Sequence, residues 1–573
     1  MPPIDVVELL FILLSFLHVA HTEYTERLIL RPLPALNQVL GSFEFSVSEV
    51  SAIESESIFP NVLRQILDKY DVGSLHLTFS IGKYADWRYG AAQNLNGSSC
   101  AHAPFGTRLQ VALRADLDAQ QRWRGITSEL GGIFSASLNQ MDKTVVTNLL
   151  PTSKLHEYGV YPSTNVSQSL LFLQGSLPRE EFCTENLTPW LKILPCRSIS
   201  GLGTLIDPIM AVSGEYLMVS LYAERSPDGT YSLRQHLTTV QSPTKRNKAR
   251  WSLGSLFLAS HQTSTNLVAC PLARKSTIIT KVNDSLDMVT TDLRIKVVPL
   301  SEPWFENWKD ASEKAVVNPS SNNQQDVVSV HRFTTGYGQV RGSIAVQLQN
   351  NHPSCGMLVT YLDVIPWYLR IYFHTFKANI RGNEQRAQKA IQAFDFVPAE
   401  QRGRPSQLRV ETFLPANTTL LFSLQMEKTF LRLSEHPPDA NRGFDIASGV
   451  ATFTIQKNSD KVSVCDEKAT SPFTTTLYTE PLLVPLPTPD FSMPYNVITM
   501  TSTVVAFFVA SETTVNTIDY YSDLLGSQNL SAICFQFFAR YLMHIMHSEN
   551  AFGVKVTSNK LRNLKDTIEH RSR

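Results

Sequence analysis

The chain has 573 residues, which is too long for one ordinary hydrophobic core, so two or three folded units are expected. Its 51 Lys and Arg residues balance 51 Asp and Glu residues. This neutral balance argues against binding to nucleic acid and against broad polybasic adhesion to a membrane. The hydrophobic content of 43%, with 30 phenylalanines and 18 tyrosines, predicts a β-rich globular protein and not a disordered one.

The N-terminal segment predicts entry into the secretory pathway. Leu9–Ala20 is apolar and lacks Asp, Glu, Lys and Arg, and it has the length of the hydrophobic region of a signal peptide. Because it is too short to span a bilayer, we predict that residues 1–22 form a cleaved signal. A retained signal anchor is the alternative, and both interpretations place the protein in the same pathway.

Residues 23–300 are predicted to form a first lumenal domain that is β-rich and contains some helix. Residues 27–30 and 42–47 are strand-like, residues 59–70 place Val62, Ile66 and Leu67 on one helical face, and residues 117–141 carry a second helical pattern. From Leu155 to Ile295, short apolar runs are broken about every ten residues by turn-forming residues, which is typical of antiparallel sheets.

A second domain follows a polar segment. Residues 301–326 are poor in strand-forming residues and form the best candidate linker. Residues 327–470 then resume the alternation of strands and turns. The predicted fold class is therefore mainly β with some α: two β-sandwich-like lumenal domains and one C-terminal transmembrane helix.

The C-terminal part begins with a proline-rich strap at residues 471–493. Prolines 481, 485, 487, 489 and 494 remove backbone donors, so residues 479–494 are predicted to be extended and poor in hydrogen bonds. Residues 494–511 are almost uncharged and have the length of a marginal transmembrane helix. The topology of residues 512–573 stays open because a second apolar run, 530–546, precedes a basic end.

The chain has seven cysteines, an odd number that indicates either a free thiol or a bond to another chain. Cys183 lies beside a proline-bounded glycosylation sequon, so we expect it to be exposed and able to bridge to another subunit. A bond between Cys196 and Cys270 would close a long loop and stabilise the fold by about 3–4 kcal/mol. Pairing of Cys183 with Cys196 is the alternative. Cys100 and Cys355 are either free buried thiols or a second bridge.

Asn-x-Ser/Thr sequons are spread over the chain, as expected of a lumenal surface. The predicted glycan carriers are Asn96, Asn165, Asn186, Asn283 and Asn417. A sixth sequon, at Asn529, lies in the tail whose topology is open.

Catalytic motifs are absent from the sequence. It contains no zinc-protease motif, no paired Cys-x-x-Cys, no Gly-x-Ser-x-Gly and no phosphate-binding glycine loop. His331, Asp363 and Ser354 would form a triad only by the coincidence that any long chain permits. We therefore predict no catalytic residue, no metal site and no cofactor.

A set of blocks is spread in order along the chain, at residues 27–34, 75–79, 130–139, 182–190, 194–196, 270–272, 335–338, 363–370 and 477–496. Together these blocks resemble the PIG-T family, the lumenal scaffold subunit of the GPI transamidase. The resemblance implies a single-pass type I protein of the endoplasmic reticulum membrane with a large lumenal part. It also implies that the catalytic residues lie on a separate caspase-like subunit, to which Cys183 would be disulfide-linked. The resemblance ends after Val505.

From these observations we expect a non-catalytic scaffold that positions precursor proteins and the GPI lipid for GPI attachment. Its expected partners are the caspase-like subunit, the other membrane subunits of the transamidase and the membrane, with no nucleic acid. Pro494, Tyr495 and Asn496 lie where a lipid headgroup or a partner helix would contact the chain. The alternatives are a lumenal hydrolase and a cell-surface adhesion receptor with β-sandwich domains.

Overall fold

The computed structural model describes residues 22–33, 36–49, 58–89, 102–114, 118–147, 170–180, 182–226, 228–242, 251–258, 266–281, 288–301, 328–336, 340–353, 355–380, 383–436, 442–455, 474–487 and 492–525. The predicted signal before Thr22, the linker after Ser301 and the tail after Leu525 lie outside these residues. Contacts divide the chain into two units, Met1–Thr488 and Pro489–Arg573, which we describe separately.

The first unit contains a ten-stranded sheet with the order β11-β10-β1-β2-β8-β7-β3-β4-β6-β5. All neighbouring strands are antiparallel except β1 and β10, which are parallel. The strands are β1 Thr22–Leu33, β2 Gln38–Glu49, β3 Val72–Ile81, β4 Gly106–Arg114, β5 Val146–Thr147, β6 Leu170–Leu177, β7 Tyr216–Arg225, β8 Tyr231–Gln241, β10 Lys275–Lys281 and β11 Met288–Asp292.

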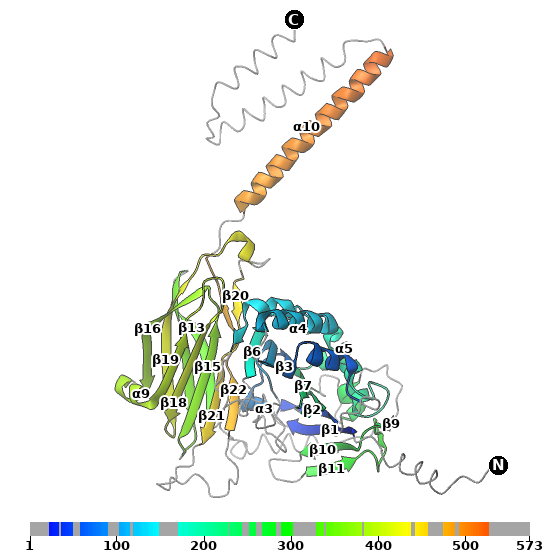
Figure 1. Ribbon diagram of the computed structural model, residues 1–573, viewed down its shortest axis with the longest axis vertical. Helices are drawn as coiled ribbons and strands as arrows, with labels where there is room; N and C mark the ends of the chain where they lie inside the picture. Colours follow the sequence, from blue (N-terminus) through cyan, green and yellow to red (C-terminus); the bar gives the residue numbers. More distant parts are fainter. Residues whose placement is uncertain are drawn as a thin grey trace, which may run out of the picture. The chain divides into compact units, whose positions relative to one another are not determined.

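Helices, and not a second sheet, pack against this sheet. They include α2 Asn61–Lys69, α4 Ala119–Phe134, α5 Thr184–Ile193, α6 Pro208–Val212 and α7 Leu253–Phe257. Trp123, Ile126 and Leu130 follow helical spacing on α4 and are buried in the same core as Leu77 of β3. Figure 1 shows α4 and α5 next to β3, β6 and β7. The β-sandwich-like arrangement predicted for residues 23–300 is therefore wrong, because helices bury the face that a second sheet would have covered, whereas the predicted mixture of strands and helices is present.

The register of α2 also differs from the sequence prediction. Leu63, Ile66 and Leu67 are buried, whereas Val62 is exposed. The helix starts at Asn61, after Pro60 in extended conformation, and this start turns Leu63 and not Val62 toward the sheet.

A sandwich of two antiparallel sheets follows, with the strand orders β13-β14-β19-β16 and β17-β18-β15-β21-β22. Both sheets contribute to one core, for example Phe422 from the first sheet and Val410 and Phe453 from the second. The strands are β13 Val328–Thr335, β14 Arg341–Asn350, β15 Met357–Ile365, β16 Leu369–Ile380, β17 Ile391–Val397, β18 Ser406–Leu414, β19 Thr418–Lys428, β21 Val450–Ile455 and β22 Thr474–Tyr478. The mainly β character of the chain is thereby confirmed.

Smaller elements complete the first unit. Strands β9 Asn266–Leu267 and β12 Val298–Pro299 pair with each other. Among the described residues of this unit, the other helices are α3 Asp86–Tyr89 and α9 Glu384–Ala390, with 3-10 turns η4 Leu138–Lys143, η6 Leu202–Leu205 and η8 Leu433–Glu435.

The proline-rich segment is packed onto the sandwich. Strand β23, Leu482–Val484, pairs with β20, Phe444–Ile446. Leu482, Val484 and Leu486 are buried in a core that also contains Ile365 and Leu369. The prediction of a strap poor in hydrogen bonds was wrong here, because Pro481 and Pro485 lie just outside the paired residues and leave the ladder donors in place.

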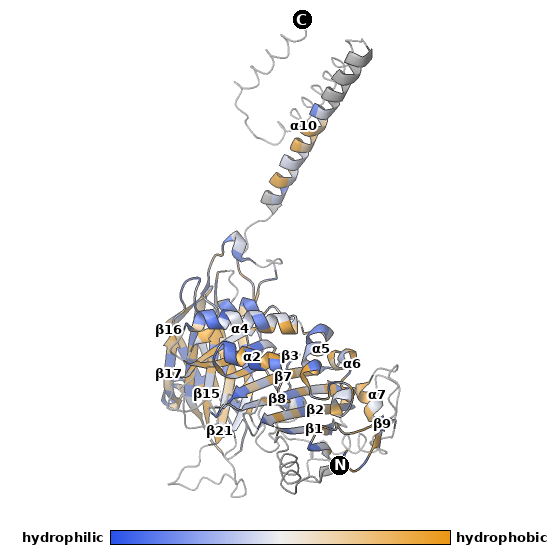
Figure 2. Ribbon diagram, turned by 45° about the vertical axis from the view of Figure 1, so that its right-hand side comes forward, coloured by the Kyte–Doolittle hydropathy of each residue, from blue (hydrophilic) through white to orange (hydrophobic). Residues whose placement is uncertain are grey.

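The second unit contains helix α10, Ser492–Leu525. Figure 2 shows apolar turns along α10 separated by paler ones. The hydroxyls of Thr499, Thr501 and Thr503 donate to carbonyls one turn earlier in the same helix. Among the helices that the structure describes, none combines the length and the apolarity needed to cross a membrane. The predicted transmembrane helix at residues 494–511 is thus not confirmed.

Candidate functional site

Cys183 lies at the start of α5, and its side chain is exposed. The backbone on both sides of Cys183 is anchored. Phe182 packs against Phe79 with ring centroids 5.1 Å apart, and the Cys183 amide donates to Asn186 Oδ1 at 2.7 Å. Among the residues that the structure describes, Cys183 is the free cysteine. The fold therefore presents a thiol at a fixed surface position.

Asn186 holds the start of α5 to the end of α4. Its Nδ2 donates to the carbonyls of Phe134 and Ser135 at 2.7 and 3.2 Å, and the side chain is buried, with 3% exposed. A glycan on this nitrogen would require both hydrogen bonds and the burial to be lost. The structure thus contradicts the predicted glycosylation of Asn186 and gives its amide a structural role.

One of the other sequons, at Asn417, lies in the part of the chain that the structure describes. Asn417 is exposed in the turn between β18 and β19, where its φ is 48°. Asn96, Asn165, Asn283 and Asn529 lie outside the described residues.

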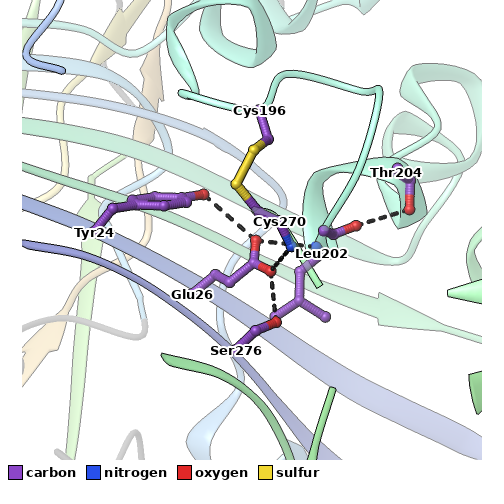
Figure 3. The surroundings of a disulfide bond; sticks show 8 residues. Tyr24, Glu26, Cys196, Leu202, Thr204, Cys270 and Ser276 are labelled. Carbon is purple, nitrogen blue, oxygen red and sulfur yellow. Dashed lines mark hydrogen bonds between the residues drawn. A yellow bond between two sulfur atoms is a disulfide. The ribbon is translucent and has the colours of Figure 1, made fainter. Parts of the chain in front are cut away.

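A disulfide joins Cys196, just after α5, to Cys270, between β9 and β10 (Figure 3). The two Cα atoms are 6.0 Å apart, and the cysteines are 74 positions apart in sequence. The alternative pairing of Cys183 with Cys196 is not formed. Cys355 is disulfide-bonded as well. The Cys196–Cys270 bond fixes the loop after α5 against the loop before β10.

A buried carboxylate, Glu26 on β1, lies beside this disulfide (Figure 3). Glu26 accepts hydrogen bonds from the amides of Leu202 and Cys270 at 3.1 and 3.2 Å. The hydroxyl of Ser276 donates to it at 2.5 Å, and that of Tyr24 at 3.5 Å. One carboxylate therefore holds two loops and two strands around the disulfide.

The surroundings of Glu26 show why this arrangement needs a glycine. Gly201 has a φ of 77°, and a Cβ at this position would lie 2.5 Å from Glu26 Oε2.

Burial raises the pKa of Glu26, while the hydrogen bonds from Ser276, Cys270 and Leu202 lower it less strongly. No sequence motif marks Glu26, because a single carboxylate in a strand is usually solvent-facing.

The residues of the imagined triad are not assembled. Asp363 accepts from Arg332 and from the hydroxyl of Tyr361, and His331 contacts Glu480 at 3.0 Å. Ser354 lies outside the described residues. Within the described part of the chain, no three His, Cys, Asp or Glu side chains are grouped closely enough to hold a metal ion.

Strand β22 and the residues after it connect the sandwich to the ten-stranded sheet, which the sequence did not predict. His102 Nε2 lies 2.7 Å from the Thr476 carbonyl, and Arg108 Nη2 donates to the Tyr478 hydroxyl at 3.2 Å. Lys83 pairs with Glu480 at 2.5 Å. Burial lowers the pKa of His102 to about 4. These contacts bring together residues at least 370 positions apart, so no local pattern could indicate them.

Pro494, Tyr495 and Asn496 all lie in the first turns of α10. The side chains of Tyr495 and Asn496 are exposed. Helix α10 belongs to the second unit of the chain.

Comparison with known proteins identifies the family. Residues 8–250 and 242–517 match the family described as "Gpi16 subunit, GPI transamidase component". The chain belongs to this family. A Gpi16-family relative from Mus musculus, "GPI-anchor transamidase component PIGT", is 32% identical over 529 residues, which cover 84% of this chain and 87% of the relative.

Two further relatives agree with this assignment. The "GPI-anchor transamidase component PIGT" of Homo sapiens is 31% identical, with 84% of this chain and 88% of the relative covered. The "GPI transamidase component PIG-T homolog" of Schizosaccharomyces pombe is 26% identical, with 82% and 84% covered. The PIG-T resemblance of the sequence blocks is therefore confirmed, and this Gpi16-family chain is a GPI transamidase component.

Proposed function

We propose that this GPI transamidase component is a non-catalytic scaffold, in the endoplasmic reticulum, for a catalytic chain of the complex. The observation that carries the proposal is the exposed Cys183 thiol on a rigid helix start in a member of the Gpi16 family. A scaffold must hold its partner in a defined orientation. A thiol whose backbone is fixed on both sides meets that requirement, because disulfide formation accepts only a narrow range of geometries.

The proposed partner of Cys183 is the caspase-like subunit that carries the nucleophilic cysteine and its histidine. The described part of this chain supports the division of labour, because its best acid–base residues are engaged in the fold. Asp363 accepts hydrogen bonds from Arg332 and Tyr361. Glu26 accepts hydrogen bonds from the backbone amides of the two loops beside it. The chain then supplies position, and the partner supplies the chemistry.

We also propose that the segment after the sandwich attaches the protein to the membrane as a single-pass type I protein. Large apolar side chains of α10, such as Val504, Phe507 and Phe508, are exposed, as suits a helix surrounded by lipid or by other helices. Tyr495 and Asn496 precede these residues and would lie near the GPI lipid headgroup. Residues 23–300 and 327–470 would form the two lumenal parts that receive precursor proteins.

One experiment tests the proposal directly. The full chain, carrying an affinity tag, is purified in mild detergent, and the co-purified proteins are analysed by mass spectrometry and on reducing and non-reducing gels. We expect a caspase-like chain that migrates together with this protein only without reductant. A monomeric species that hydrolyses a lumenal substrate would instead support a hydrolase. A species without transamidase subunits that adheres to extracellular matrix would support an adhesion receptor.

A further inference from the structure

Five aliphatic side chains are exposed around the Cys196–Cys270 disulfide, and we call them the loop patch: Ile199, Val268, Leu272, Ile295 and Val297. Ile199 and Ile295 are 83% and 87% exposed, so each side chain is almost fully in solvent. Isolated exposed aliphatics are common, but a group of five at one place is a feature of interaction surfaces.

The patch lies on three loops that are bonded to one another. The first loop contains Ile199, the second Val268 and Leu272, and the third Ile295 and Val297. The disulfide joins the first loop to the second, and the Gly201 amide donates to the Val268 carbonyl at 2.9 Å. The second and third loops are joined by the pairing of Leu267 with Val298 and by Arg294 Nη1, which donates to the Arg274 carbonyl at 2.8 Å. The patch is thus a preformed surface, which lowers the entropy cost of binding.

Two patch residues lie next to the paired strands β9 and β12. Leu267 and Val298 face each other in the ladder and are both buried. Val268 and Val297, the residues next to this pair in the chain, are instead both about half exposed.

The loops that carry the patch are rich in Lys and Arg, of which Arg274 pairs with Glu23 at 3.1 Å. Residues 192–199, 266–275 and 292–297 contain six Lys or Arg and one Asp, although the whole chain is neutral. Arg197, Lys275 and Lys296 form no ion pair with any residue that the structure describes. A ligand that covers the aliphatic side chains and carries negative charge would complement this surface.

Helix α5 connects the patch to Cys183. Cys183 precedes the helix and Cys196 follows it, so the two ends of this ten-residue helix are about 15 Å apart. Glu185, Thr188 and Lys192 are exposed along its outer face, at helical spacing. A partner bonded to Cys183 can therefore extend along α5 and reach Ile199.

We propose that the loop patch docks an acidic polypeptide segment with aliphatic side chains, belonging to the subunit that is bonded to Cys183. This inference rests on the proposed function. A polypeptide fits better than a membrane surface, because the patch consists of Val, Ile and Leu on fixed loops. Membrane-interface sites are instead enriched in Trp and Tyr.

The test uses the tagged full chain expressed with the other transamidase subunits. The double variant Ile199→Asp/Ile295→Asp places two carboxylates on the patch, and Val62→Asp, at an exposed valine of α2, is the matched control. With reductant present, we expect the double variant to recover at least about tenfold less of the bonded subunit, since hot-spot contacts at an interface contribute this much or more. Val62→Asp should match the wild type. Equal thermal unfolding of all three proteins excludes misfolding.

A second arm identifies the occupant. A photoreactive amino acid at position 295 should crosslink to an acidic, aliphatic segment of the subunit bonded to Cys183, and the same group at position 62 should not. Arg294→Glu/Lys296→Glu should also reduce recovery, and the wild-type interaction should weaken with added salt.

The outcomes separate the two proposals. Full recovery of the subunit by the double variant would overturn the docking site and leave the scaffold intact. Recovery of no transamidase subunit by the wild type would overturn the proposed function itself. Binding of the wild type to phosphatidylserine vesicles, lost in the double variant while subunit recovery is unchanged, would assign the patch to lipid and reject the polypeptide.

Discussion

Asp363 and Arg332 form an ion pair in which Oδ1 and Nη1 are 2.5 Å apart, and each side chain is at most 1% exposed to solvent. Tyr361 donates to the other carboxylate oxygen at 2.9 Å. Arg332 also donates to the carbonyls of Ala447 and Glu480. The pair therefore joins β13 and β15 to the segments before β21 and β23, and Asp363 is engaged in the fold.

Breaking this pair should strongly destabilise the sandwich. Asp363→Ala leaves a buried guanidinium without its counter-ion, and we expect a loss of about 3–5 kcal/mol in the free energy of unfolding. Chemical denaturation of the wild type and the variant measures this loss. The control is Glu400→Gln, which breaks the exposed pair of Glu400 with Arg404 and should cost no more than about 1 kcal/mol. Similar effects of both substitutions would contradict this assignment.

Glu26 should make stability depend on pH in a defined direction. Burial raises its pKa in the folded protein, so above the ordinary glutamate pKa the folded state keeps a proton that the unfolded state has released. The contribution of Glu26 to the free energy of unfolding is therefore fully present below the ordinary glutamate pKa, and it is lost as the pH rises through the raised pKa. Glu26→Gln should remove this component in a series of denaturation curves from acid to neutral pH. An exposed carboxylate, Glu185, changed to Gln should leave the slope unchanged.

The two described sequons should behave differently. Peptide mapping of the protein from a glycosylating host should find a glycan on Asn417 and none on Asn186. Asn186→Ala should lower the free energy of unfolding by about 1–3 kcal/mol, because the substitution leaves buried backbone groups unsatisfied. Asn417→Asp, which keeps a residue type that tolerates the left-handed backbone at this position, should change the mass and leave stability nearly unchanged. A glycosylated Asn186 in folded protein would reject the structural role.

Substitution of the free cysteine and of a disulfide-bonded cysteine should have different effects on the protein. Cys183→Ser should abolish the heavy species on a non-reducing gel and leave thermal unfolding unchanged, because this thiol is exposed. Cys196→Ser should instead destabilise the chain by about 2–5 kcal/mol, as expected when a native bridge is lost. A heavy species that persists in Cys183→Ser would show that another cysteine forms the intersubunit bond.

Neighbouring residues of β23 offer a further test. Val484 is buried against the end of the sandwich, whereas Leu483 is half exposed on the other face of the strand. We expect Val484→Asp to release β23 from β20 and to reduce GPI attachment to a reporter protein in cells. Leu483→Asp should leave attachment close to the wild-type level at equal expression. Equal attachment by both variants would mean that docking of β23 is not needed for function.

The sandwich could be predicted from the sequence because two of its strands, β18 and β19, alternate strictly. Buried and less buried residues follow each other along β18 and β19, and this period is visible in the residue types. Strand β7 is buried on both faces, with nine consecutive buried residues. Such a run shows that both faces are covered but not by what. The helical patterns at residues 59–70 and 117–141 indicated α2 and α4, but nothing in these patterns placed the two helices on the ten-stranded sheet.

The candidate site was partly predictable for a similar reason. The proline and the sequon after Cys183 correctly suggested an exposed thiol, because both signals are local. The choice between the two cysteine pairings depends on how the loop after α5 and the loop before β10 approach each other, which no spacing encodes. The burial of Asn186 depends on the end of α4, more than fifty positions earlier.

The order of the last strands determines how the protein would respond to mechanical load. Tension applied through the chain after residue 487 reaches the three-residue ladder of β23 with β20 first and the five-residue ladder of β22 with β21 next. Residues at the end of β22 and just beyond it, Tyr478 and Glu480, are also bonded to Arg108 in β4 of the other sheet and to Lys83, just after β3. A pull on this end therefore spreads across both β structures before either core begins to open.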